Sequence, residues 1–560
     1  VVATSRYCIH LEVNAASPKH WYFSIIYASP QLGHREETWE ELRQFNSTIS
    51  GPWCLAGDYN TVLFDHEKIG GAHANRHSCE AFENCINDCN LLDLGYAGST
   101  FTWNRGQLYE RLDRVLCNPT WQYLFPDSTI AHLPLPTSDH CGLWIQMTGS
   151  RHHNNKPFKF MAPWLDHPDF NNQVLNSWHN SFNWIDNINN TSSKLREWNR
   201  DVLGNIFKRK ERILRRLEGI NRQLQNNHIE RLIILRDELW GEYNVIVKQE
   251  EVYWQHQSHT KWLTLGDKNT RFFHMSALQR RRKNKIAALQ DNNGQWIYEE
   301  NALQNLMVNF YKNLYSSSHI IDTDFPTYQT FPTIKEDDLN LLKSEITIEE
   351  TKHALFSMGN LKSPGPDGFH PVFFKSQWDI VGTALHKLVV NCFLDPNHIE
   401  EINNTRITLI PKCEDPSMAN QFRPIALCNV AYKVVTKVLT QRLRMIMPYI
   451  ISQNQSSFIP GRSTVDNILV LQESIQTLSH MHGQKGYMII KLDLEKAYDR
   501  LEWNFIEDTL MKLQLPHQLI SLIMKCISPN SLSLNWNGSI TDSFKSSRGL
   551  RQGDPISPYL

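Results

Sequence analysis

The stretch KLDLEKAYDR at residues 491–500 decides how the C-terminal part of this chain is interpreted. The apolar run at residues 487–492 predicts a short buried strand. Asp493 would lie at the end of that strand with its carboxylate directed into a cleft, a position suited to a catalytic metal ion. A second motif, RQGDP at 551–555, follows shortly before the last residue, Leu560.

Composition limits the classes of protein to which the chain can belong. With 560 residues and a net charge of -1, it is long enough for about three domains of ordinary size. Neither a bilayer-spanning apolar run nor a secretory leader is apparent, so we expect an intracellular protein without a membrane partner. The 11 cysteines show no CxxC spacing, which predicts reduced, mostly buried thiols. Because the net charge is almost neutral, any surface that binds nucleic acid must be local.

The hydrophobic pattern divides the chain into three parts. Residues 1–150 alternate short apolar runs with helix-like stretches, which predicts a layered α/β domain. Residues 151–333 combine many charges with apolar residues at helical spacing, which predicts long antiparallel helices that project from a compact body. Residues 334–560 predict helices around a few short strands, with Thr347 and Glu350 as a capping box near the start.

Polar residues follow the apolar runs of the first part at four places. A carboxylate and an amide two residues apart at a strand end point the same way, and an Asp-His pair can supply a metal ligand beside a base. Any one of these motifs alone is weak evidence, since GDYN is more often a turn than a site. They are Tyr27 in IYASP, Asp58 and Asn60 in GDYN, Asp113 in RLDR, and Asp139 with His140 in TSDH.

In this order, the four motifs resemble those of the endonuclease/exonuclease/phosphatase family, as found in the apurinic-type endonuclease of LINE retrotransposons. The resemblance implies that Asp58 orients or deprotonates the attacking water. It also implies that Asn60 and Tyr27 hold the scissile phosphate, in a site that binds a divalent metal ion.

The same resemblance assigns further residues and reveals one departure. Asp139 would help to bind the metal, and His140, oriented by Asp113, would stabilise the pentacovalent phosphorus or transfer a proton. Thr102 in FTW would line the wall that faces DNA. The family pattern includes a metal-binding glutamate near the N-terminus, where this chain has only Glu12, in a different context. We therefore expect a partial endonuclease fold that is inactive alone and whose sheet has an unpaired edge.

Two basic segments lie in the middle part. The first, FKRKER at 207–212, is followed by further charges with interspersed glutamates and is typical of a solvated helix face, with a nucleic-acid contact as the alternative. The second resembles the linker between endonuclease and polymerase in plant LINE elements, and we place it near the entrance of the RNA template. It combines phosphate-binding charge with rings that can stack on bases, and comprises Arg280, Arg281, Arg282 and Lys283, with Phe272 and Phe273 upstream.

The third part resembles the reverse transcriptases of LINE-type retrotransposons. KSPGPDG at 362–368 predicts a turn whose glycines allow close approach of a ligand, or which is only a loop. ITLIPK at 407–412 and NQFRPI at 420–425 are similar to the fingers of these enzymes. The resemblance implies that Lys412 and Arg423 bind the triphosphate of the incoming nucleotide.

The palm motifs carry the remaining assignments. The resemblance implies that Asp493 binds both metal ions and that Tyr498 packs against the sugar and so selects deoxynucleotides. It also implies that Gln552 contacts the nucleotide and that Gly553 lets the template strand pass. In the family, a later strand carries two further aspartates, and this chain ends at Leu560 before such a strand. Since one carboxylate cannot hold two metal ions, we expect residues 1–560 alone to lack polymerase activity.

These interpretations combine into a multidomain α/β and α+β protein. It would contain a partial endonuclease/exonuclease/phosphatase sandwich in 1–150, a helical linker with a basic segment in 151–333, and reverse transcriptase fingers with a partial palm in 334–560. The resemblance to a plant LINE polyprotein implies Mg²⁺ as cofactor, and RNA template, target DNA and dNTPs as partners. In intact relatives it implies target-primed reverse transcription, with entry into the nucleus at integration. The alternative is a non-enzymatic remnant of a decayed element that binds RNA or DNA.

Overall fold

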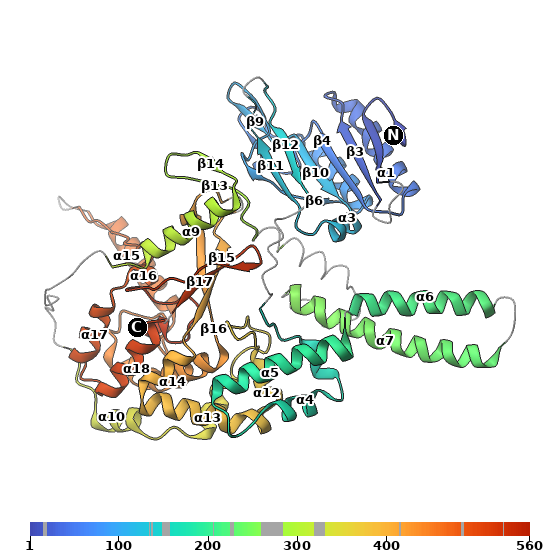
Figure 1. Cartoon of the computed structure of the whole chain (residues 1–560). Coiled ribbons are helices and arrows are strands. Elements are labelled where there is room, and N and C mark those ends of the chain that lie inside the picture. The colour runs from blue at the N-terminus through green and yellow to red at the C-terminus, as the bar shows by residue number, and fades with distance from the viewer. Residues whose placement is uncertain are drawn as a thin grey trace. The chain divides into compact units, whose positions relative to one another are not determined.

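The computed structural model describes residues 1–14, 20–133, 135, 138–147, 157–204, 206–224, 229–258, 280, 284–317, 331–413, 416–482, 486–529 and 531–560. The chain divides into two compact units (Figure 1). Both units combine segments from more than one of the predicted parts, so the boundaries at 150 and 333 stay a prediction. The first unit consists of Val1–Asn155, His274–Met307 and Ile410–Arg423, and the second of Lys156–Phe273, Val308–Leu409 and Pro424–Leu560.

The first unit is built on a six-stranded sheet in which β3 and β4 are parallel neighbours. The helices α1 (Arg35–Thr48) and α2 (Arg76–Asp88) share a core with one face of this sheet, to which Trp39, Trp53 and Phe82 contribute. The edge strand β1 pairs only with β2 among the described strands, in keeping with the expected unpaired edge. The strand order is β1 (Ala3–Thr4), β2 (Cys8–Val13), β3 (Trp21–Tyr27), β4 (Trp53–Asp58), β10 (Asp113–Cys117) and β6 (Leu92–Asp93).

Smaller sheets complete the first unit. Ile130 of β11 shares a second core with Trp21, Val115 and Trp121, the last of which lies in α3 (Pro119–Leu124). Ile130 and His132 are buried while their neighbours along β11 are partly exposed, the pattern of a strand with one face on a core. The predicted α/β sandwich is therefore confirmed. The sheets are β12 (Gly142–Gln146) with β11 (Thr129–Leu133) and β7 (Ala97–Gly98), and β5 (Lys68–Ile69) with β9 (Leu108–Glu110) and β8 (Trp103–Arg105).

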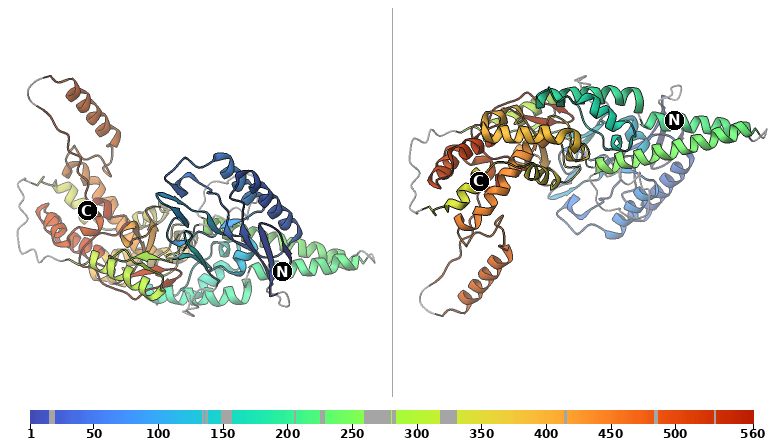
Figure 2. Two further views of the ribbon diagram at one scale, coloured as in Figure 1. Left: turned by 90° about the horizontal axis from the view of Figure 1, so that it is seen from above. Right: turned by 90° about the horizontal axis from the view of Figure 1, so that it is seen from below.

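Two long helices of the second unit, α6 (Ile206–Leu224) and α7 (Glu230–Ser258), pack against each other. Ile213 and Leu217 of α6 are buried with Leu239 and Ile246 of α7, at the helical spacing expected from the sequence. Figures 1 and 2 show the two helices side by side as a hairpin that extends away from the other helices of the same unit. The predicted antiparallel, projecting helices are confirmed.

The helices that precede this hairpin belong to the core of the C-terminal part. They are α4 (Phe170–Ser177) and α5 (Trp184–Trp198). The ring of Trp184 stacks on that of Phe374 in α12 (Pro371–Ser376), with centroids 5.8 Å apart. Because such aromatic pairs add to the stabilisation from buried area, these two helices are part of the fold of the second unit.

The core of the second unit is organised around α14 (Val430–Ile450), most of whose apolar side chains are buried. At the start of α11, the side chains of Thr347 and Glu350 each accept from the other's backbone N–H, at 3.1 and 3.0 Å, which confirms the predicted capping box. The parallel pair β15–β17 lies at the centre of a four-stranded sheet. The elements are α10 (Glu336–Lys343), α11 (Ile348–Phe356), α13 (Trp378–Leu394), α17 (Trp503–Lys512) and α18 (His517–Ile527), with the strands β16 (Phe422–Cys428), β15 (Thr405–Pro411), β17 (Leu532–Trp536) and β18 (Ser539–Ile540).

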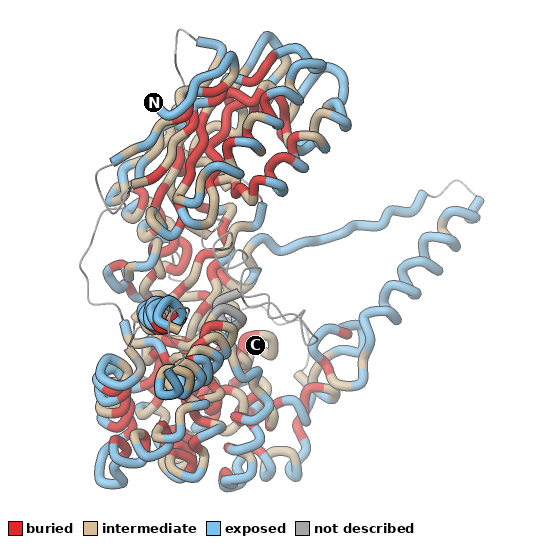
Figure 3. Tube along the Cα trace, turned by 90° about the vertical axis from the view of Figure 1, so that its right-hand side faces the viewer, coloured by how far each residue is buried: buried red, intermediate tan, exposed pale blue. Residues whose placement is uncertain are grey.

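The strand predicted at residues 487–492 is not formed. Met488 and Leu492 are 80% and 86% exposed, and the segment joins no sheet of the described residues. The prediction was wrong because a strand needs a hydrogen-bonding partner, and none of the described strands pairs with this segment. The preceding helix α15 (Thr464–His480) likewise has no buried residue. Figure 3 shows the helix and the segment after it as one exposed arm of the second unit.

Two expectations from composition can be compared with the structure. The cysteines are free thiols, as predicted, and most are buried; Cys79 and Cys141 are partly exposed and Cys413 is exposed. Among the described residues, no helix is both long enough and apolar enough to cross a membrane.

Candidate active site

Two strands of the first unit bring the acidic residues of GDYN and RLDR together. Asp58 is the last residue of β4 and Asp113 is the first residue of β10, and the two are paired directly across the antiparallel ladder. Residues opposite each other in such a ladder have Cβ atoms about 4.5–5.5 Å apart. The register of the sheet therefore places both carboxylates at the same end of neighbouring strands.

His140 joins this pair from the segment before β12. Its Nδ1 atom lies 2.8 Å from Oδ2 of Asp113, and its backbone forms an isolated bridge with Trp103. A carboxylate on one ring nitrogen fixes the orientation of the ring and leaves the other nitrogen for a ligand. The contact expected between His140 and Asp113 is thus present in the structure, and its catalytic role stays a prediction.

Asn60 holds the carboxylate of Asp58 from the following turn. Its backbone N–H donates to Oδ1 of Asp58 at 2.8 Å, while its Nδ2 atom donates to Oδ2 of Asp58 at 3.0 Å and to the carbonyl of Ala28 at 2.8 Å. The backbone of Asn60 is left-handed, with φ 49°, a conformation that asparagine tolerates better than most residues. Tyr27 ends β3 in register with Asp58, and its side chain is 61% exposed.

Burial and neighbouring charges shift the pKa values of this group. Burial, assisted by Asp113, raises the pKa of Asp58 to about 6, against the opposing effects of the Asn60 backbone N–H and of His140. Burial also raises the pKa of Asp113. Burial alone would lower the pKa of His140, but Asp113 and Asp58 outweigh it and the pKa rises. Two carboxylates at close range favour the binding of a proton or a metal cation.

The residues present fit a divalent metal ion. Asp58, Asp113 and His140 each offer a ligand atom, and these atoms lie within 4.8 Å of one another. Carboxylate oxygens are ligands for Mg²⁺, and imidazole nitrogen extends the choice to transition metals. Asp139 is not a member of this set; its Oδ2 atom accepts a hydrogen bond from Nε1 of Trp103 at 3.0 Å.

Glu12 lies at the opposite end of the sheet from this group. It pairs with Tyr22 near the start of β3, whereas Tyr27 at the other end of β3 pairs with Asp58. Because a strand rises about 3.3 Å per residue, Glu12 cannot reach a metal ion bound at Asp58. Glu12 is therefore not part of this site.

Near the site, the structure gives Thr102 another role than the predicted one and adds Arg35, which was not predicted. Thr102 does not line an open wall: it is 1% exposed, and its Oγ1 atom accepts from the backbone N–H groups of Leu112 and Asp113, each at 2.9 Å. It therefore positions the start of β10. Arg35 was missed, although its charge acts on Asp58 and its side chain donates to the carbonyl of Ser29 at 3.0 Å. No local pattern distinguishes Arg35 from other arginines at a helix start.

The arginines of RLDR form a buried ionic cluster beneath the site. Arg111 binds Glu67 at 2.9 Å and Asp93 at 3.0 Å. Arg114 binds the same two carboxylates, at 3.0 Å in the case of Asp93. Two cations thus balance two anions in the interior, which buried charges require. The alternation of charges around Asp113 in the sequence was a signal for this cluster.

The predicted palm residues lie in different environments of the second unit. Asp493 is exposed and, in the described part of the chain, has no hydrogen bond or ion pair with Tyr498 or Gln552. Gln552 instead donates from Nε2 to Oδ1 of Asp499 at 3.3 Å, and the hydroxyl of Tyr315 donates to the same oxygen at 3.2 Å. Asp499 is 3% exposed. It was missed as a structural residue because the motif was interpreted around Asp493.

The predicted cations of the fingers both lie on the β15–β16 hairpin. Lys412 and Arg423 are exposed, and the backbone N–H of Lys412 donates to the carbonyl of Gln421 at 2.8 Å. Both residues belong to the first unit, whereas Asp493 and Tyr498 belong to the second. The hairpin therefore presents two cations to solvent, which suits the binding of a polyanion.

Two further motifs of the third part have structural roles. Arg551 is buried and donates to Oδ1 of Asn403 and Oγ1 of Thr405, each at 2.7 Å. In KSPGPDG at 362–368, a Cβ atom on Gly365 or Gly368 would overlap the protein's own backbone, at Asn429 and Phe158 respectively. The close approach made by these glycines is therefore internal. Gly553 is exposed and has φ 108°, a conformation available to glycine.

The basic segment of the linker is described only at its ends. Arg280 is exposed, and Nζ of Lys285 donates to the carbonyl of Asp127 at 2.7 Å. The predicted nucleic-acid contacts of Arg281, Arg282 and Lys283, with the rings of Phe272 and Phe273, lie outside the described residues.

Two protein-family models match the chain. Residues 6–140 match the endonuclease/exonuclease/phosphatase family, and residues 410–560 match the reverse transcriptase (RNA-dependent DNA polymerase) family. The two families generally use divalent metal ions. The first match contains the Asp58 group, and the second contains Lys412, Arg423 and the palm motifs.

Three relatives of the chain come from transposable elements. The Transposon TX1 uncharacterized 149 kDa protein of Xenopus laevis is 28% identical over 52% of this chain and 22% of its own length. The Pol polyprotein from the type-2 retrotransposable element R2DM of Drosophila melanogaster is 29% identical over 39% of this chain and 20% of its own length. The Pol polyprotein from the type-1 retrotransposable element R2 of Popillia japonica is 30% identical over 35% of this chain and 27% of its own length.

The chain spans between 20% and 27% of the length of these three relatives. It combines an endonuclease/exonuclease/phosphatase domain with a reverse transcriptase domain, and it is homologous to non-LTR retrotransposon polyproteins.

Proposed function

We propose that this chain is the segment of a LINE-type polyprotein that joins a DNA endonuclease to an RNA-directed DNA polymerase. The observation that carries the endonuclease proposal is the assembly of Asp58, Asp113 and His140 within 4.8 Å at one end of a sheet. The family match at residues 410–560 supports the polymerase. In intact relatives the endonuclease nicks target DNA and the freed 3′-hydroxyl primes copying of the RNA, so the product would enter the nucleus. The linker WLTLGDKNTRFFHMSALQRRRKNKI at 262–286 supports a plant-like origin.

In the endonuclease, Asp58 accepts the proton of the attacking water. Its pKa of about 6 suits a base that works near neutral pH. Both N–H groups of the Asn60 amide are already used, by Asp58 and Ala28, so we assign Asn60 first to holding Asp58 in place. The exposed hydroxyl of Tyr27 is then better placed than that amide to contact the phosphate.

His140 and the acidic groups complete the site. His140 is held by Asp113, and its raised pKa favours the protonated form; in that form it would stabilise the phosphorane or protonate the leaving oxygen. A divalent ion such as Mg²⁺, when held by the carboxylates of Asp58 and Asp113, would supply additional charge at the phosphate. Asp139, predicted from the sequence as a metal ligand, would join it only after releasing its hydrogen bond with Trp103. Without the family's glutamate, we expect strand cleavage by residues 1–560 to be undetectable.

In the polymerase, Lys412 and Arg423 bind the triphosphate, and Tyr498 and Gln552 contact the sugar and base of the incoming dNTP. Gly553 leaves room for the template strand. Metal binding would fall to Asp493. Because one carboxylate cannot hold two ions, we propose that residues 1–560 alone bind primer, template and dNTP without extending the primer.

A second candidate is a polypeptide that only binds nucleic acid. The observation that favours it is the segment around Asp493, in which Leu492 and Leu494 are 86% and 79% exposed and no described strand pairs with them. A carboxylate on an unpaired segment is not held in the fixed position that metal catalysis requires.

The two candidates can be separated with purified residues 1–560 and a labelled DNA primer on an RNA template. We expect binding that is weakened in the double variant Lys412→Ala/Arg423→Ala and unchanged in the control Lys194→Ala/Arg200→Ala, whose cations are also exposed. With Mg²⁺ and dNTPs we expect no extension, but the dNTP that pairs with the template should tighten the complex if the polymerase proposal holds and should have no effect on a polypeptide that only binds nucleic acid. Extension that disappears in Asp493→Ala would establish the polymerase and refute the binding-only candidate. Failure to bind primer–template at low salt would refute both.

A further inference from the structure

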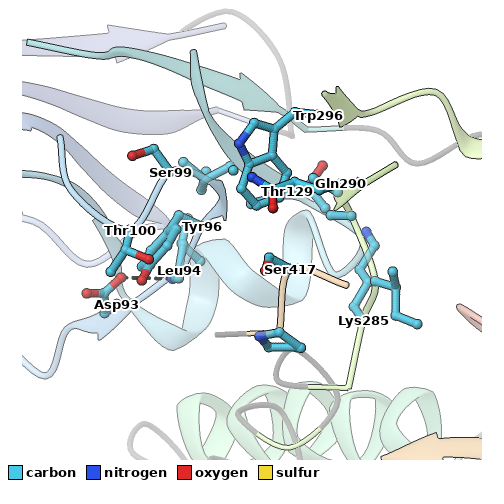
Figure 4. A pocket seen from close by; sticks show the side chains of 18 of the residues that line it. Asp93, Leu94, Tyr96, Ser99, Thr100, Thr129, Lys285, Gln290, Trp296 and Ser417 are labelled. Atoms are coloured by element: carbon cyan, nitrogen blue, oxygen red, sulfur yellow. Dashed lines mark hydrogen bonds between the residues drawn. The ribbon is translucent and has the colours of Figure 1, made fainter. Parts of the chain in front are cut away.

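A cavity of about 670 Å³ lies within the first unit, and neither Asp58 nor His140 lines it. Segments that are distant in sequence form its walls: the loop at 92–101, the start of β11, the residues at 285–296 and the tip of the fingers hairpin (Figure 4). The two-stranded ribbon β13 (Leu289–Gln290) and β14 (Trp296–Ile297) is joined to the hairpin, since the backbone N–H of Gln290 donates to the carbonyl of Ser417 at 2.7 Å. Cavities of this size accommodate nucleotide-sized ligands.

A tyrosine and a tryptophan line the cavity. Tyr96 is held rigidly, because Arg111 lies over its ring at 4.5 Å and His132 stacks on it at 4.5 Å. Trp296 also lines the cavity and is partly exposed. An indole that borders a cavity offers a flat apolar surface, on which a nucleobase of any sequence can stack.

Polar groups of the cavity have hydrogen-bonding capacity to spare. The hydroxyl of Ser128 is buried, lines the cavity and has no hydrogen-bond partner in the described structure. Leaving a buried polar group unpaired costs free energy, and such groups in native proteins are satisfied by water or a ligand. The amide of Gln290 lies in the same wall as Trp296 (Figure 4). An amide and a hydroxyl can together read the donors and acceptors of a base edge.

The charged residues that line the cavity in the described structure are Asp93 and Lys285. Burial alone would raise the pKa of Asp93, but Arg111 and Arg114 lower it below its usual range, so this carboxylate is ionised; together with Glu67 it is balanced by the two guanidinium groups. Lys285 adds a positive charge to the wall, and its Nζ atom donates to the carbonyl of Asp127 at 2.7 Å. Lys285 also follows directly on the cationic run that starts at Arg280.

We propose that this cavity binds one nucleotide of a single-stranded nucleic acid. Its base stacks on Trp296, Gln290 and Ser128 bond to the base edge, and Lys285 contacts the adjacent phosphate. This proposal rests on the proposed function. It adds that the endonuclease, the linker and the fingers hairpin together hold the nucleic acid as a single strand. RNA and DNA share the chemistry of this contact, and the test distinguishes them.

The experiment compares Trp296→Ala with Trp144→Ala in residues 1–560. Trp144 lies on β12 of the same unit, is 60% exposed and does not line the cavity. Fluorescence anisotropy with labelled single-stranded RNA, single-stranded DNA and duplex DNA is measured in EDTA, so that no cleavage or synthesis contributes. We expect Trp296→Ala to weaken single-strand binding about tenfold, the effect of one lost stacking contact. Trp144→Ala and duplex binding should be unchanged.

A second measurement locates the contact directly. Strands that carry 4-thiouridine or 4-thiothymidine are photocrosslinked to the wild-type chain, and the adduct is mapped by mass spectrometry. We expect adducts at Trp296 or Tyr96, with a higher yield for whichever of RNA and DNA binds more tightly. Adducts confined to other surfaces, or equal affinity of Trp296→Ala and wild type, would overturn the proposal. If Lys412→Ala/Arg423→Ala still weakened binding in that case, the proposed function would stand. Absence of any single-strand binding would refute both.

Discussion

The Nδ1 atom of His140 lies 2.8 Å from Oδ2 of Asp113, across 27 positions of sequence. Asp113 is paired in turn with Asp58 across the sheet. One imidazole therefore faces two buried carboxylates at the end of a rigid ladder. This arrangement determines the protonation of the group, and its consequences can be measured without any catalytic assay.

The variant Asp113→Asn should lower the pKa of His140. Burial already lowers this pKa, and the Asp113 carboxylate contributes the largest opposing effects, so that its removal leaves the charge of Asp58 as the main support. The pKa is measured by following the imidazole signals in NMR spectra over a pH titration. Asp65→Asn, which removes an exposed carboxylate of the same unit, is the control and should leave His140 unchanged. An unaltered His140 pKa in Asp113→Asn would show that Asp113 does not affect the protonation of His140.

The variant Asp58→Asn should stabilise the protein at high pH in the absence of metal. The pKa of Asp58 in the folded protein, about 6, lies above the value of 3.8 for an unperturbed aspartate. The native state therefore loses stability as the pH rises through 6, when a buried charge must form beside Asp113. Removing the carboxyl should raise the free energy of unfolding by about 1–3 kcal/mol at about pH 8 and leave it nearly unchanged at about pH 4. Urea denaturation in EDTA tests this, with Asp65→Asn as control. Equal effects at both pH values would contradict the ionisation argument.

Much of this site was predictable because most of its residues lie at one end of an apolar run. Asp58 and Tyr27 end neighbouring strands, and Asp113 begins a third, so that a correct assignment of strands also places the side chains at one end of the sheet. The role of Thr102 was not predictable in the same way. Whether a threonine beside a site faces solvent or bonds to the next strand depends on the fold of a connecting segment, which the local pattern does not specify.

The strand at residues 487–492 failed for a related reason. Its β-branched and apolar composition was interpreted correctly as favourable for a strand, but strand formation depends on a partner that local sequence does not supply. The same limit applies to the RQGDP motif. Arg551 received no role from the sequence, yet it bonds to Asn403 and Thr405, two residues near the start of β15 that no sequence spacing connects with it.

Acid should destabilise the first unit through His132. Burial lowers its pKa from 6.5 to about 4, so the unfolded chain takes up a proton below about pH 6.5 that the folded chain resists until about pH 4. The free energy of unfolding is therefore highest above about pH 6.5 and falls by about 3 kcal/mol as the pH drops from there to about 4. His132→Gln should reduce this loss, and His77→Gln, which alters an exposed histidine of α2, should not. Denaturation midpoints at about pH 7 and pH 4.5 decide the matter. An unchanged pH dependence in His132→Gln would assign the loss to another group.

Arg551→Met should destabilise the second unit severely. The buried guanidinium bonds to Asn403 and Thr405 and pairs with Asp554 at 3.6 Å, and removing one member of such a network leaves the others unpaired. We expect a loss of about 3–5 kcal/mol in urea denaturation. The neighbouring variant Gln552→Ala, at a partly exposed position, should cost about 1 kcal/mol or less. Similar losses in the two variants would mean that the Arg551 network contributes little.

The arginines at 280–282 should set the salt dependence of RNA binding. Each phosphate that is neutralised on a single strand adds about −0.7 to the slope of log K against log salt. Replacing all three with alanine should therefore make the slope about two units shallower. The matched control replaces Arg212, Arg215 and Arg216, which are exposed on α6, a helix whose charges the sequence assigns to a solvated face. If the slope changed in the α6 variant and not in the linker variant, α6 would be the RNA-binding segment and the linker arginines would be the solvated ones. Equal slopes in all three proteins would place the phosphate contacts elsewhere, with the exposed cations Lys412 and Arg423 as the next candidates.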